Sequence, residues 1–179
     1  KIYDDKFIED WYESEKQKEE YREKGKKTLK KFYDDLIEKG DTFIIPKLLE
    51  QPFNVKIGDY ILIGKIDRVD VLPDGTCEII DYKTGASKDE KDVKKEQLYI
   101  YHIAATEALR PPLKPSKLSF YYLDDNSTVS FTATEEELEK FKEKVIMQIQ
   151  EIRKNNFEPK PGFLCKYCDY KNICEYRAE

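Results

Sequence analysis

Three residues near the middle of the chain have the types and spacing that metal-assisted hydrolysis requires. Asp81 and Lys83 are two residues apart, so in a strand their side chains point to the same face. Asp67 belongs to an earlier strand-like segment, in which alternating apolar residues predict a face turned to the core. The apolar residues that share this face with Asp67 are Ile61, Ile63, Val69 and Val71. A carboxylate among core residues needs a partner.

The turn signal Pro73-Asp74-Gly75 separates the two segments and folds one back on the other. Such a hairpin can bring Asp67 beside Asp81. Two converging carboxylates bind a hard divalent cation, which polarises a phosphate oxygen and activates water, and a lysine can orient that water or neutralise developing charge. Taken alone, an Asp-x-Lys sequence is more simply interpreted as a buried ion pair that joins two strands.

Periodicity and turn residues predict an order of α, β-β-β, α, β-β, α and an irregular tail, in which the first three strands form an antiparallel meander. The first helix is one long helix or two broken near Gly25, and Gly40 predicts its end. Thr134 and Glu137 predict a capping box at the start of the last helix. The predicted helices cover 10–39, 91–109 and the stretch from 134 (apolar stripe Leu138, Phe141, Val145, Ile149 and Ile152), and the strands cover 53–57, 60–72, 77–83, 117–123 and 128–132. This order predicts an α/β domain with a mixed sheet.

Length and composition limit what the chain can be. Its 179 residues are enough for one domain with a core, but not for two full domains. No apolar run approaches the roughly 20 residues that span a bilayer, and no signal peptide stands at the charged start, so we expect a cytoplasmic protein without membrane contact. The net charge of -5 argues against a large phosphate-tracking surface, although not against carboxylates that hold a metal. The first residue, Lys1, indicates a fragment of a larger protein.

Three of the four cysteines lie in the last fifteen residues, as Cys165-x2-Cys168-x5-Cys174. This clustering is typical of a metal site in a reducing compartment, and disulfide pairing would leave one of the three without a partner. We therefore expect the three thiols to lie within a few ångströms of one another. Zinc or an iron–sulfur cluster normally takes four ligands, and Cys77 is the remaining cysteine. Because Cys77 lies on the strand that leads to Asp81, we expect it to be a small core residue.

Four ordered motifs resemble those of RecB-type nucleases of the PD-(D/E)XK superfamily. They are residues 64–70 (GKIDRVD), 79–85 (IIDYKTG), 97–101 (QLYIY) and the closing cysteines, and the match as a whole extends roughly over 25–174. The cysteine motif resembles the iron–sulfur branch, which includes AddB-type subunits, CRISPR-associated exonucleases and nuclease domains fused to UvrD-like helicases.

The resemblance implies a restriction-endonuclease-like fold, a mixed sheet flanked by helices with a cysteine-containing tail, formed by residues 1–179 as a single domain. It implies a deoxyribonuclease, of exonuclease type, that uses Mg²⁺ or Mn²⁺ in DNA repair or recombination. The implied partners are DNA and a helicase domain or subunit. It also implies a [4Fe–4S] cluster on Cys165, Cys168 and Cys174, whose fourth cysteine lies upstream of the first helix.

The resemblance assigns a role to each motif residue. The implied metal ligands are Asp67, Asp81, the carbonyl of Tyr82 and Glu50, and the implied catalytic residues are Asp67, Asp81, Lys83, Gln97 and Tyr101. Gln97 and Tyr101 are four residues apart and share one helix face, although Tyr101 could instead be a core aromatic and Gln97 an exposed residue. Glu50 could equally be a solvated strand residue.

One position departs from the family pattern. RecB-type nucleases often carry a metal-binding histidine three residues after a glycine of the first helix, and here Gly25 places Thr28 there. Because threonine binds metal poorly, a helix carboxylate such as Glu23 would have to replace it. The only histidine, His102, is expected to be structural. The lysines of this helix, which could contact phosphate but more simply form a solvated face, are Lys24, Lys26, Lys27, Lys30 and Lys31.

Two other functions fit the same residues. The first is a catalytically weak or inactive nuclease-like module that binds DNA or takes part in an assembly. Thr28, at the position of the metal-binding histidine, would then mark the loss of activity. The second is a zinc-stabilised protein-interaction domain in which the Asp–Lys pairs are structural. Metal-dependent cleavage of DNA would distinguish the nuclease from both.

Overall fold

The computed structural model describes residues 2–40, 44–87 and 89–178. It shows the predicted α/β fold, with a five-stranded mixed sheet in the order β1-β2-β3-β4-β5. The strands are β1 (Leu48–Ile57), β2 (Tyr60–Val71), β3 (Cys77–Lys83), β4 (Pro115–Tyr122) and β5 (Ser127–Phe131). The helices are α1 (Ile2–Lys6), α2 (Glu15–Lys39), α3 (Glu96–Ile103) and α4 (Glu135–Lys154), and a short 3-10 helix, Phe163–Tyr167, lies in the tail.

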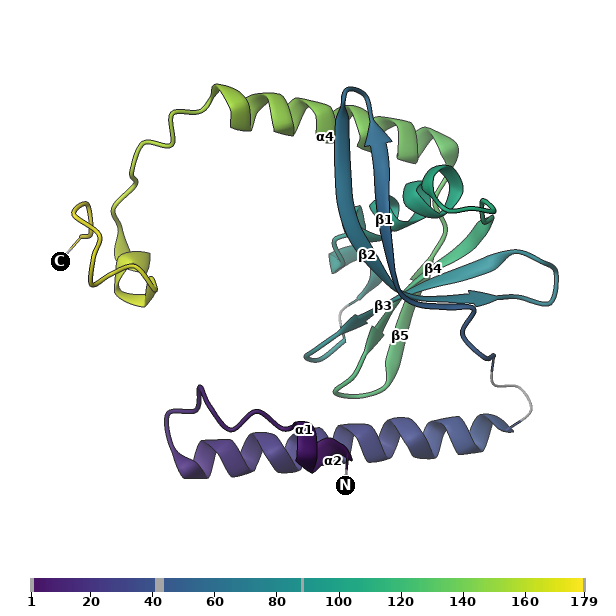
Figure 1. The fold of residues 1–179 in the computed structure, drawn as a ribbon, viewed down its shortest axis with the longest axis horizontal. Coiled ribbons are helices and arrows are strands. Elements are labelled where there is room, and N and C mark those ends of the chain that lie inside the picture. Colours follow the sequence, from purple (N-terminus) through teal and green to yellow (C-terminus); the bar gives the residue numbers. More distant parts are fainter. Residues whose placement is uncertain (1, 41–43, 88, 179) are drawn as a thin grey trace. The chain divides into compact units, whose positions relative to one another are not determined.

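The strand connections place one helix on each face of the sheet. β1, β2 and β3 form the predicted antiparallel meander, and β4 pairs with β5 antiparallel. β3 and β4 are parallel, and the crossover between them contains α3. Because parallel neighbours need a long connection, this crossover lays α3 over β3 and β4, which it contacts. Figure 1 shows α2 along the opposite side of the sheet.

α2 is one continuous helix, not two helices broken at Gly25. Ser14 caps its start by accepting a hydrogen bond from the backbone N–H of Gln17, at 3.2 Å. As predicted, the helix ends at Gly40, whose φ of 46° is in the left-handed region that glycine adopts without strain. Phe32 docks the helix on the sheet, since its ring meets those of Tyr82 and Tyr121 edge-on, with centroids 6.5 and 5.7 Å away.

The helix predicted over 91–109 is shorter in the structure. α3 begins at Glu96, after a separate 3-10 turn at Glu90–Asp92, and a π-helical turn at Ala104–Ala108 follows it. The stretch before Glu96 is lysine-rich and mainly exposed, so no packed apolar face stabilises a helical first turn there. Leu98 is the first fully buried residue of α3.

The predicted core face of β2 is wrong at three of its four apolar residues. Ile61, Ile63 and Val71 are 65%, 79% and 40% exposed, and Val69 alone is buried. β1 pairs with β2 from Tyr60 to Val69, whereas β3 pairs with Arg68 to Val71 alone. The β1–β2 hairpin therefore extends beyond the rest of the sheet (Figure 1), and a tertiary feature of this kind leaves no local signal.

The last helix begins as predicted, and its stripe is partly buried. Glu137 and Thr134 form the capping box through hydrogen bonds of 2.8 and 3.2 Å. Leu138, Phe141 and Val145 are buried, whereas Ile152 is exposed, so the predicted stripe is wrong at its end. The described chain divides into two compact units, Lys1–Lys142 and Glu143–Glu179, within α4.

Gly64 is required where the hairpin packs on Phe53, and this requirement can be tested. A Cβ at position 64 would lie 2.5 Å from Cζ of Phe53. We expect Gly64→Ala to lower the free energy of unfolding by about 1–3 kcal/mol in urea melts, because the ring cannot move without losing its contacts. Ile63→Ala, on the exposed neighbour, should change it by less than about 0.5 kcal/mol. Adding Phe53→Leu should recover part of the loss, and an unchanged melt for Gly64→Ala would contradict this packing.

Candidate active site

Asp81 is a buried carboxylate at the centre of the site. It is 1% exposed, and its Oδ2 lies 2.6 Å from Nζ of Lys83 in an ion pair. Within the described residues, this oxygen accepts no hydrogen bond with good geometry. Burial raises the pKa of Asp81, the ion pair with Lys83 lowers it, and the charge of Asp67 raises it again. The carboxylate thus carries a charge that the chain compensates only in part.

Asp67 reaches the same place from β2. The antiparallel pairing of β2 with β3 ends at Arg68 and Ile80, so Asp67 lies where the two strands separate. Its Oδ2 accepts a hydrogen bond of 3.0 Å from the backbone N–H of Tyr82. The structure therefore brings Asp67 next to the Asp81–Tyr82 backbone, as the sequence analysis expected.

A hydrogen-bond chain from α3 orients both the lysine and the buried aspartate. Lys83 Nζ donates to Gln97 Oε1 at 2.6 Å, and Gln97 Nε2 donates to the hydroxyl of Tyr101 at 2.9 Å. Tyr101 in turn makes a side-chain hydrogen bond with Asp81 that lowers the pKa of the carboxyl. Because both ends of the Gln97 amide are used, its orientation is determined, and so is the position of the ammonium group.

The parallel pairing of β3 with β4 adds a residue that the sequence analysis missed. Phe120 pairs with Asp81 across the two strands, and Lys83 Nζ lies 5.3 Å from the centroid of its ring. A cation over an aromatic face is held away from bulk water. Phe120 lies far from Asp81 in the sequence, so only the pairing of β3 with β4 could have identified Phe120 as a residue of the site.

Glu50 lies beside the site but is engaged elsewhere. Its neighbours in β1 pair with Arg68 and Ile66, so Glu50, with a φ of 50°, lies opposite Asp67. Its carboxylate forms an exposed ion pair with Lys65.

The charge of Glu50 nevertheless acts on Tyr101. Burial raises the pKa of Tyr101, the hydrogen bond from Gln97 lowers it, and the charges of Asp67, Asp81 and Glu50 then raise it. Glu50 therefore acts on this site through its charge.

The donor set fits one divalent cation. Asp67 and Asp81 repel each other, and the buried Oδ2 of Asp81 has an ion pair but no hydrogen-bond donor. Oxygen ligands of this kind suit magnesium or manganese, with the carbonyl of Tyr82 as a further ligand. The described residues contain no group of three His, Cys, Asp or Glu side chains that could hold a metal, so Glu50 does not complete a third carboxylate here.

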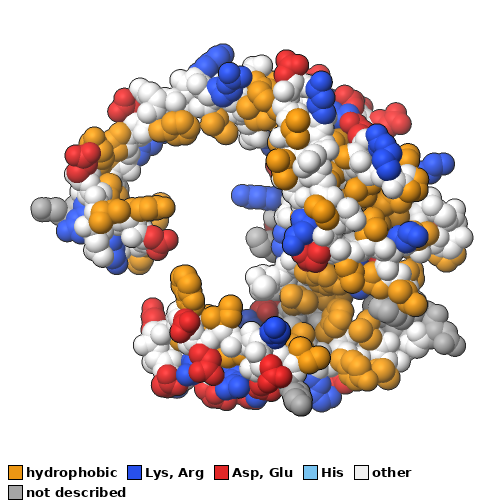
Figure 2. Space-filling view, viewed as in Figure 1, with side chains coloured by type: hydrophobic (Ala, Val, Ile, Leu, Met, Phe, Trp, Pro, Cys, Tyr) orange, Lys and Arg blue, Asp and Glu red, His pale blue; other side chains and the backbone are white. Residues whose placement is uncertain are grey.

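Thr28 lies in a groove between α2 and the turn that follows β4. The groove has a volume of about 500 Å³. Lys24 forms an ion pair with Asp124 at 2.8 Å, and Lys31 donates to the carbonyl of Asp125 at 2.6 Å, so two lysines of the basic cluster connect α2 to this turn. Acidic and basic side chains are interspersed over α2 in Figure 2, as expected of a solvated face.

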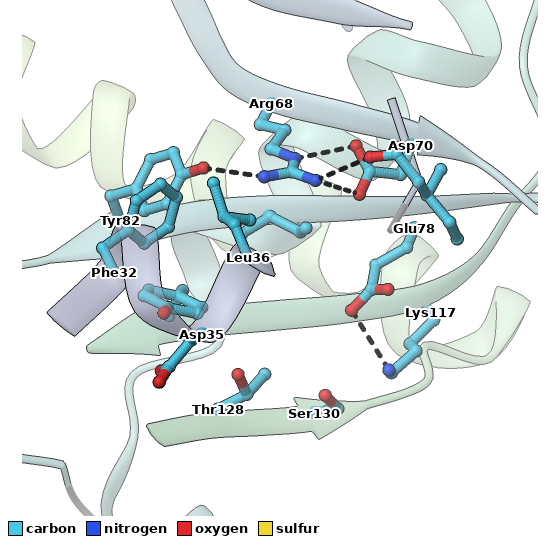
Figure 3. Close-up of a pocket in the computed structure, with 13 residues that line it drawn as sticks. Phe32, Asp35, Leu36, Arg68, Asp70, Glu78, Tyr82, Lys117, Thr128 and Ser130 are labelled. Atoms are coloured by element: carbon cyan, nitrogen blue, oxygen red, sulfur yellow. Dashed lines mark hydrogen bonds and ion pairs between the residues drawn. The ribbon is translucent and has the colours of Figure 1, made fainter. Parts of the chain in front are cut away.

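A second cavity, of about 330 Å³, lies on the opposite face of the sheet, under Phe32 (Figure 3). Its main feature is a buried ion pair in which Nε and Nη2 of Arg68 lie 2.8 and 2.7 Å from the carboxylate of Asp70. Arg68 also donates to the hydroxyl of Tyr82 at 3.1 Å and to the carbonyl of Ile44 at 3.2 Å. These hydrogen bonds join strands β2 and β3 to the segment that precedes β1, on the face of the sheet opposite α3.

The tail cysteines do not form a preassembled metal site in the described residues. Cys165 accepts a hydrogen bond from the backbone N–H of Gly162 at 3.3 Å. Such backbone hydrogen bonds, from Ala178 and Gly162, lower the pKa of Cys165 and so favour its thiolate. Cys168 and Cys174 are exposed, and each lies in its own tight turn. The prediction that the three thiols lie within a few ångströms of one another is therefore wrong for the described residues, in which each cysteine lies in a separate turn of the tail.

Two other residues are structural, as predicted. Cys77 is buried at the start of β3, and burial raises the pKa of its thiol to about 11. His102 is half-buried on α3, and burial lowers its pKa, which keeps the ring neutral. Neither is a candidate for metal binding.

No helix in the described part of the chain is long and apolar enough to cross a membrane.

Comparison with known proteins identifies the family of the chain. No curated protein matches the chain. A solved structure titled "Crystal structure of SSO0001" is 19% identical, covers 90% of this chain and 79% of its own, and superposes with a TM-score of 0.43. A family model described as the PD-(D/E)XK nuclease superfamily matches residues 3–175, and the restriction-endonuclease-like mixed sheet flanked by helices is the fold expected of it. The chain belongs to the PD-(D/E)XK nuclease superfamily.

Proposed function

We propose that this chain is a deoxyribonuclease that uses Mg²⁺ or Mn²⁺ to hydrolyse phosphodiester bonds, acting as an exonuclease in DNA repair or recombination. The observation that supports this best is the environment of Asp81. A buried carboxylate, one oxygen of which has an ion pair but no hydrogen bond among the described residues, stands beside a second carboxylate and a lysine whose position is determined by Gln97. A structural ion pair would not need the second carboxylate, which costs stability through repulsion.

Each residue has a defined part in the proposed reaction. A divalent cation held by Asp67, Asp81 and the carbonyl of Tyr82 would supply Lewis-acid polarisation of the phosphodiester. Lys83 places its ammonium group at the edge of this centre, where it can orient a water molecule or neutralise charge that develops on the phosphate. Gln97 positions Lys83, and Tyr101 positions Asp81. Phe120, beneath the lysine, excludes water from that side.

A second candidate function is a nuclease-like module that binds DNA with little or no cleavage. Thr28 stands where the family's histidine ligand is expected, and Glu50 is paired with Lys65. A cation with two carboxylate ligands would be held more weakly than one with three. An assay of cleavage with Mn²⁺ on single- and double-stranded DNA separates the two functions.

The finer parts of the proposal concern partners and the tail. We infer a helicase domain or subunit as the partner and a [4Fe–4S] cluster on Cys165, Cys168 and Cys174, completed by an upstream cysteine. The support is the resemblance of the cysteine spacing to the iron–sulfur branch and the lowered pKa of Cys165. Because the three thiols are not gathered here, no step of the reaction is assigned to this cluster.

Replacing the lysine should separate cleavage from binding. We expect Lys83→Ala to lower the rate of DNA cleavage by roughly two to three orders of magnitude, because a charge aimed at the transition state is lost. Fluorescence anisotropy should show nearly unchanged DNA binding. Lys117→Ala is the matched control, since Lys117 forms an ion pair with Glu78 on the other face of the sheet, and it should cleave normally. Cleavage by Lys83→Ala at the wild-type rate would overturn the assignment.

Replacing the buried aspartate should stabilise the metal-free protein. Burial raises the pKa of Asp81, so the wild type loses stability as pH rises above the ordinary aspartate pKa of about 4. Asp81→Asn carries no such charge and should unfold at higher urea than wild type at about pH 7.5 with a chelator, with the advantage vanishing near pH 4.

The same variant tests the cation. Millimolar Mn²⁺ should raise the Tm of the wild type by ligand linkage and leave that of Asp81→Asn almost unchanged. Equal shifts in both proteins, or no shift in the wild type, would show that these carboxylates do not form the cation site.

The tail makes a separate prediction about metal content. A longer protein that includes an upstream cysteine, purified without oxygen and supplied with iron, should be brown and contain iron by elemental analysis. A variant with serine at Cys165, Cys168 and Cys174 should be colourless, whereas Cys77→Ser should keep its iron because that thiol is buried in the sheet. A longer protein with neither iron nor zinc would show that the cysteines are structural thiols.

A further inference from the structure

The strand pairing between β2 and β3 ends one residue short of the two carboxylates of the candidate active site. Arg68 and Ile80 form the last pair of the two strands. Asp67 and Asp81 follow at the next position on each strand. The backbone hydrogen bonds of the ladder therefore do not fix the separation of these carboxylates, and contacts other than the ladder have to hold β2 beside β3 at this point.

Tyr82 connects β3 to β2 on both faces of the sheet, beyond the end of the ladder. Its backbone N–H donates to Oδ2 of Asp67, in the site, at 3.0 Å. Its hydroxyl lies on the opposite face and accepts a hydrogen bond of 3.1 Å from Nη1 of Arg68 (Figure 3). The first of these bonds uses a carboxylate of the site, whereas the second uses none of the oxygens assigned to the cation. The Arg68–Tyr82 bond can therefore hold the strands together whatever Asp67 binds.

The guanidinium of Arg68 has a fixed position. Its Nε and Nη2 lie 2.8 and 2.7 Å from the carboxylate oxygens of Asp70, and Nη2 also donates to the carbonyl of Ile44 at 3.2 Å. Arg68 and Asp70 are 8% and 4% exposed, so water competes little for these bonds. Because the guanidinium is planar, the same bonds determine where Nη1 points, which is at the hydroxyl of Tyr82.

The ring of Tyr82 carries this position to its backbone. The ring packs edge-on against Phe32 of α2 and Tyr121 of β4, with centroids 6.5 and 5.7 Å away. A ring that is packed by two neighbours and hydrogen-bonded at its hydroxyl cannot turn without losing contacts, so the hydroxyl and the backbone of Tyr82 move together. This backbone supplies the N–H that binds Asp67 and, in the proposed function, the carbonyl that binds the cation.

We propose that Arg68 is a positioning residue of the candidate active site, which acts through Tyr82 to set the separation of Asp67 from Asp81. The proposal rests on the nuclease function above and adds to it a residue on the opposite face of the sheet. An ion pair between Arg68 and Asp70 stays within β2, whereas the bond to Tyr82 reaches β3 at the place where strand pairing ends.

Amide hydrogen exchange of the metal-free protein, followed by NMR with a chelator present, tests the proposal. The amide of residue 82 reports the bond to Asp67, and the amide of Ile79 reports the intact sheet. Tyr82→Phe removes only the hydroxyl, and the amide of residue 82 should exchange about tenfold faster, because a hydrogen bond from a charged donor is lost. The amide of Ile79 should keep its protection.

The matched control is Tyr121→Phe, which removes the same atom from the ring beside Tyr82 and should leave both amides unchanged. Equal exchange of the residue 82 amide in Tyr82→Phe and wild type would overturn the proposal. Equal acceleration at residue 82 and at Ile79 would mean a general loss of stability and would overturn it too.

A second variant removes the guanidinium without leaving a buried charge. In Arg68→Met/Asp70→Leu both partners of the ion pair become apolar, a replacement that folded proteins often tolerate. Exchange at residue 82 should rise as it does in Tyr82→Phe. Adding Tyr82→Phe to this double variant should raise it no further, because both changes remove the same bond. Increases that simply add would show that Arg68 and Tyr82 act independently, contrary to the proposal.

Binding of Mn²⁺ connects the positioning role to the nuclease function. Calorimetric titration should give a Kd for Mn²⁺ about tenfold higher for Tyr82→Phe than for wild type, as for other residues that orient metal ligands, and an unchanged Kd for Tyr121→Phe. A wild type that neither binds Mn²⁺ nor cleaves DNA would refute the nuclease function, whereas exchange at residue 82 still decides whether Arg68 holds Asp67 in place. Equal Kd values for wild type and Tyr82→Phe would overturn the positioning role.

Discussion

The buried charge of Asp81 is the constraint on which the site depends. A carboxylate with 1% exposure in the middle of a sheet is costly unless cations or hydrogen-bond donors compensate it. Here Lys83 supplies an ion pair and Tyr101 a hydrogen bond, and Gln97 holds these two groups together. One oxygen still accepts no hydrogen bond among the described residues. With Asp67 nearby, two carboxylates share the single positive charge of Lys83.

The buried carboxylates on the two faces of the sheet have different hydrogen-bond partners. On the side of α2, Arg68 and Asp70 form a bidentate pair, and Tyr82 and a backbone carbonyl accept the remaining hydrogens of the guanidinium. Bidentate pairing of this kind gives both charges strong, charge-assisted hydrogen bonds. On the side of α3, two carboxylates face one lysine. The bidentate pairing of Asp70, which leaves neither of its oxygens without a donor, distinguishes this ion pair from Asp81, whose Oδ2 accepts no hydrogen bond among the described residues.

The crossover from β3 to β4 explains why these residues meet. A parallel pair of strands needs a long connection, and the helix in this connection packs back on the two strands that it joins. Gln97 and Tyr101 are therefore carried onto Asp81 and Lys83 by the same topology that brings Phe120 under the lysine. Beyond the end of β3, the β1–β2 hairpin continues alone, and Ile61 and Ile63 of this part are exposed.

Local patterns determined much of this protein. The two-residue spacing of Asp81 and Lys83, the turn before β3, the capping box at Thr134 and the four-residue spacing on α3 follow from backbone periodicity, which a sequence displays directly. Only the tertiary structure decided where the pairing of β3 with β2 ends. The same holds for the exposure of Ile61 and for the ion pair between Glu50 and Lys65. The physical reason is that alternation tells which residues share a face of a strand, whereas burial of that face depends on what distant segments pack against it.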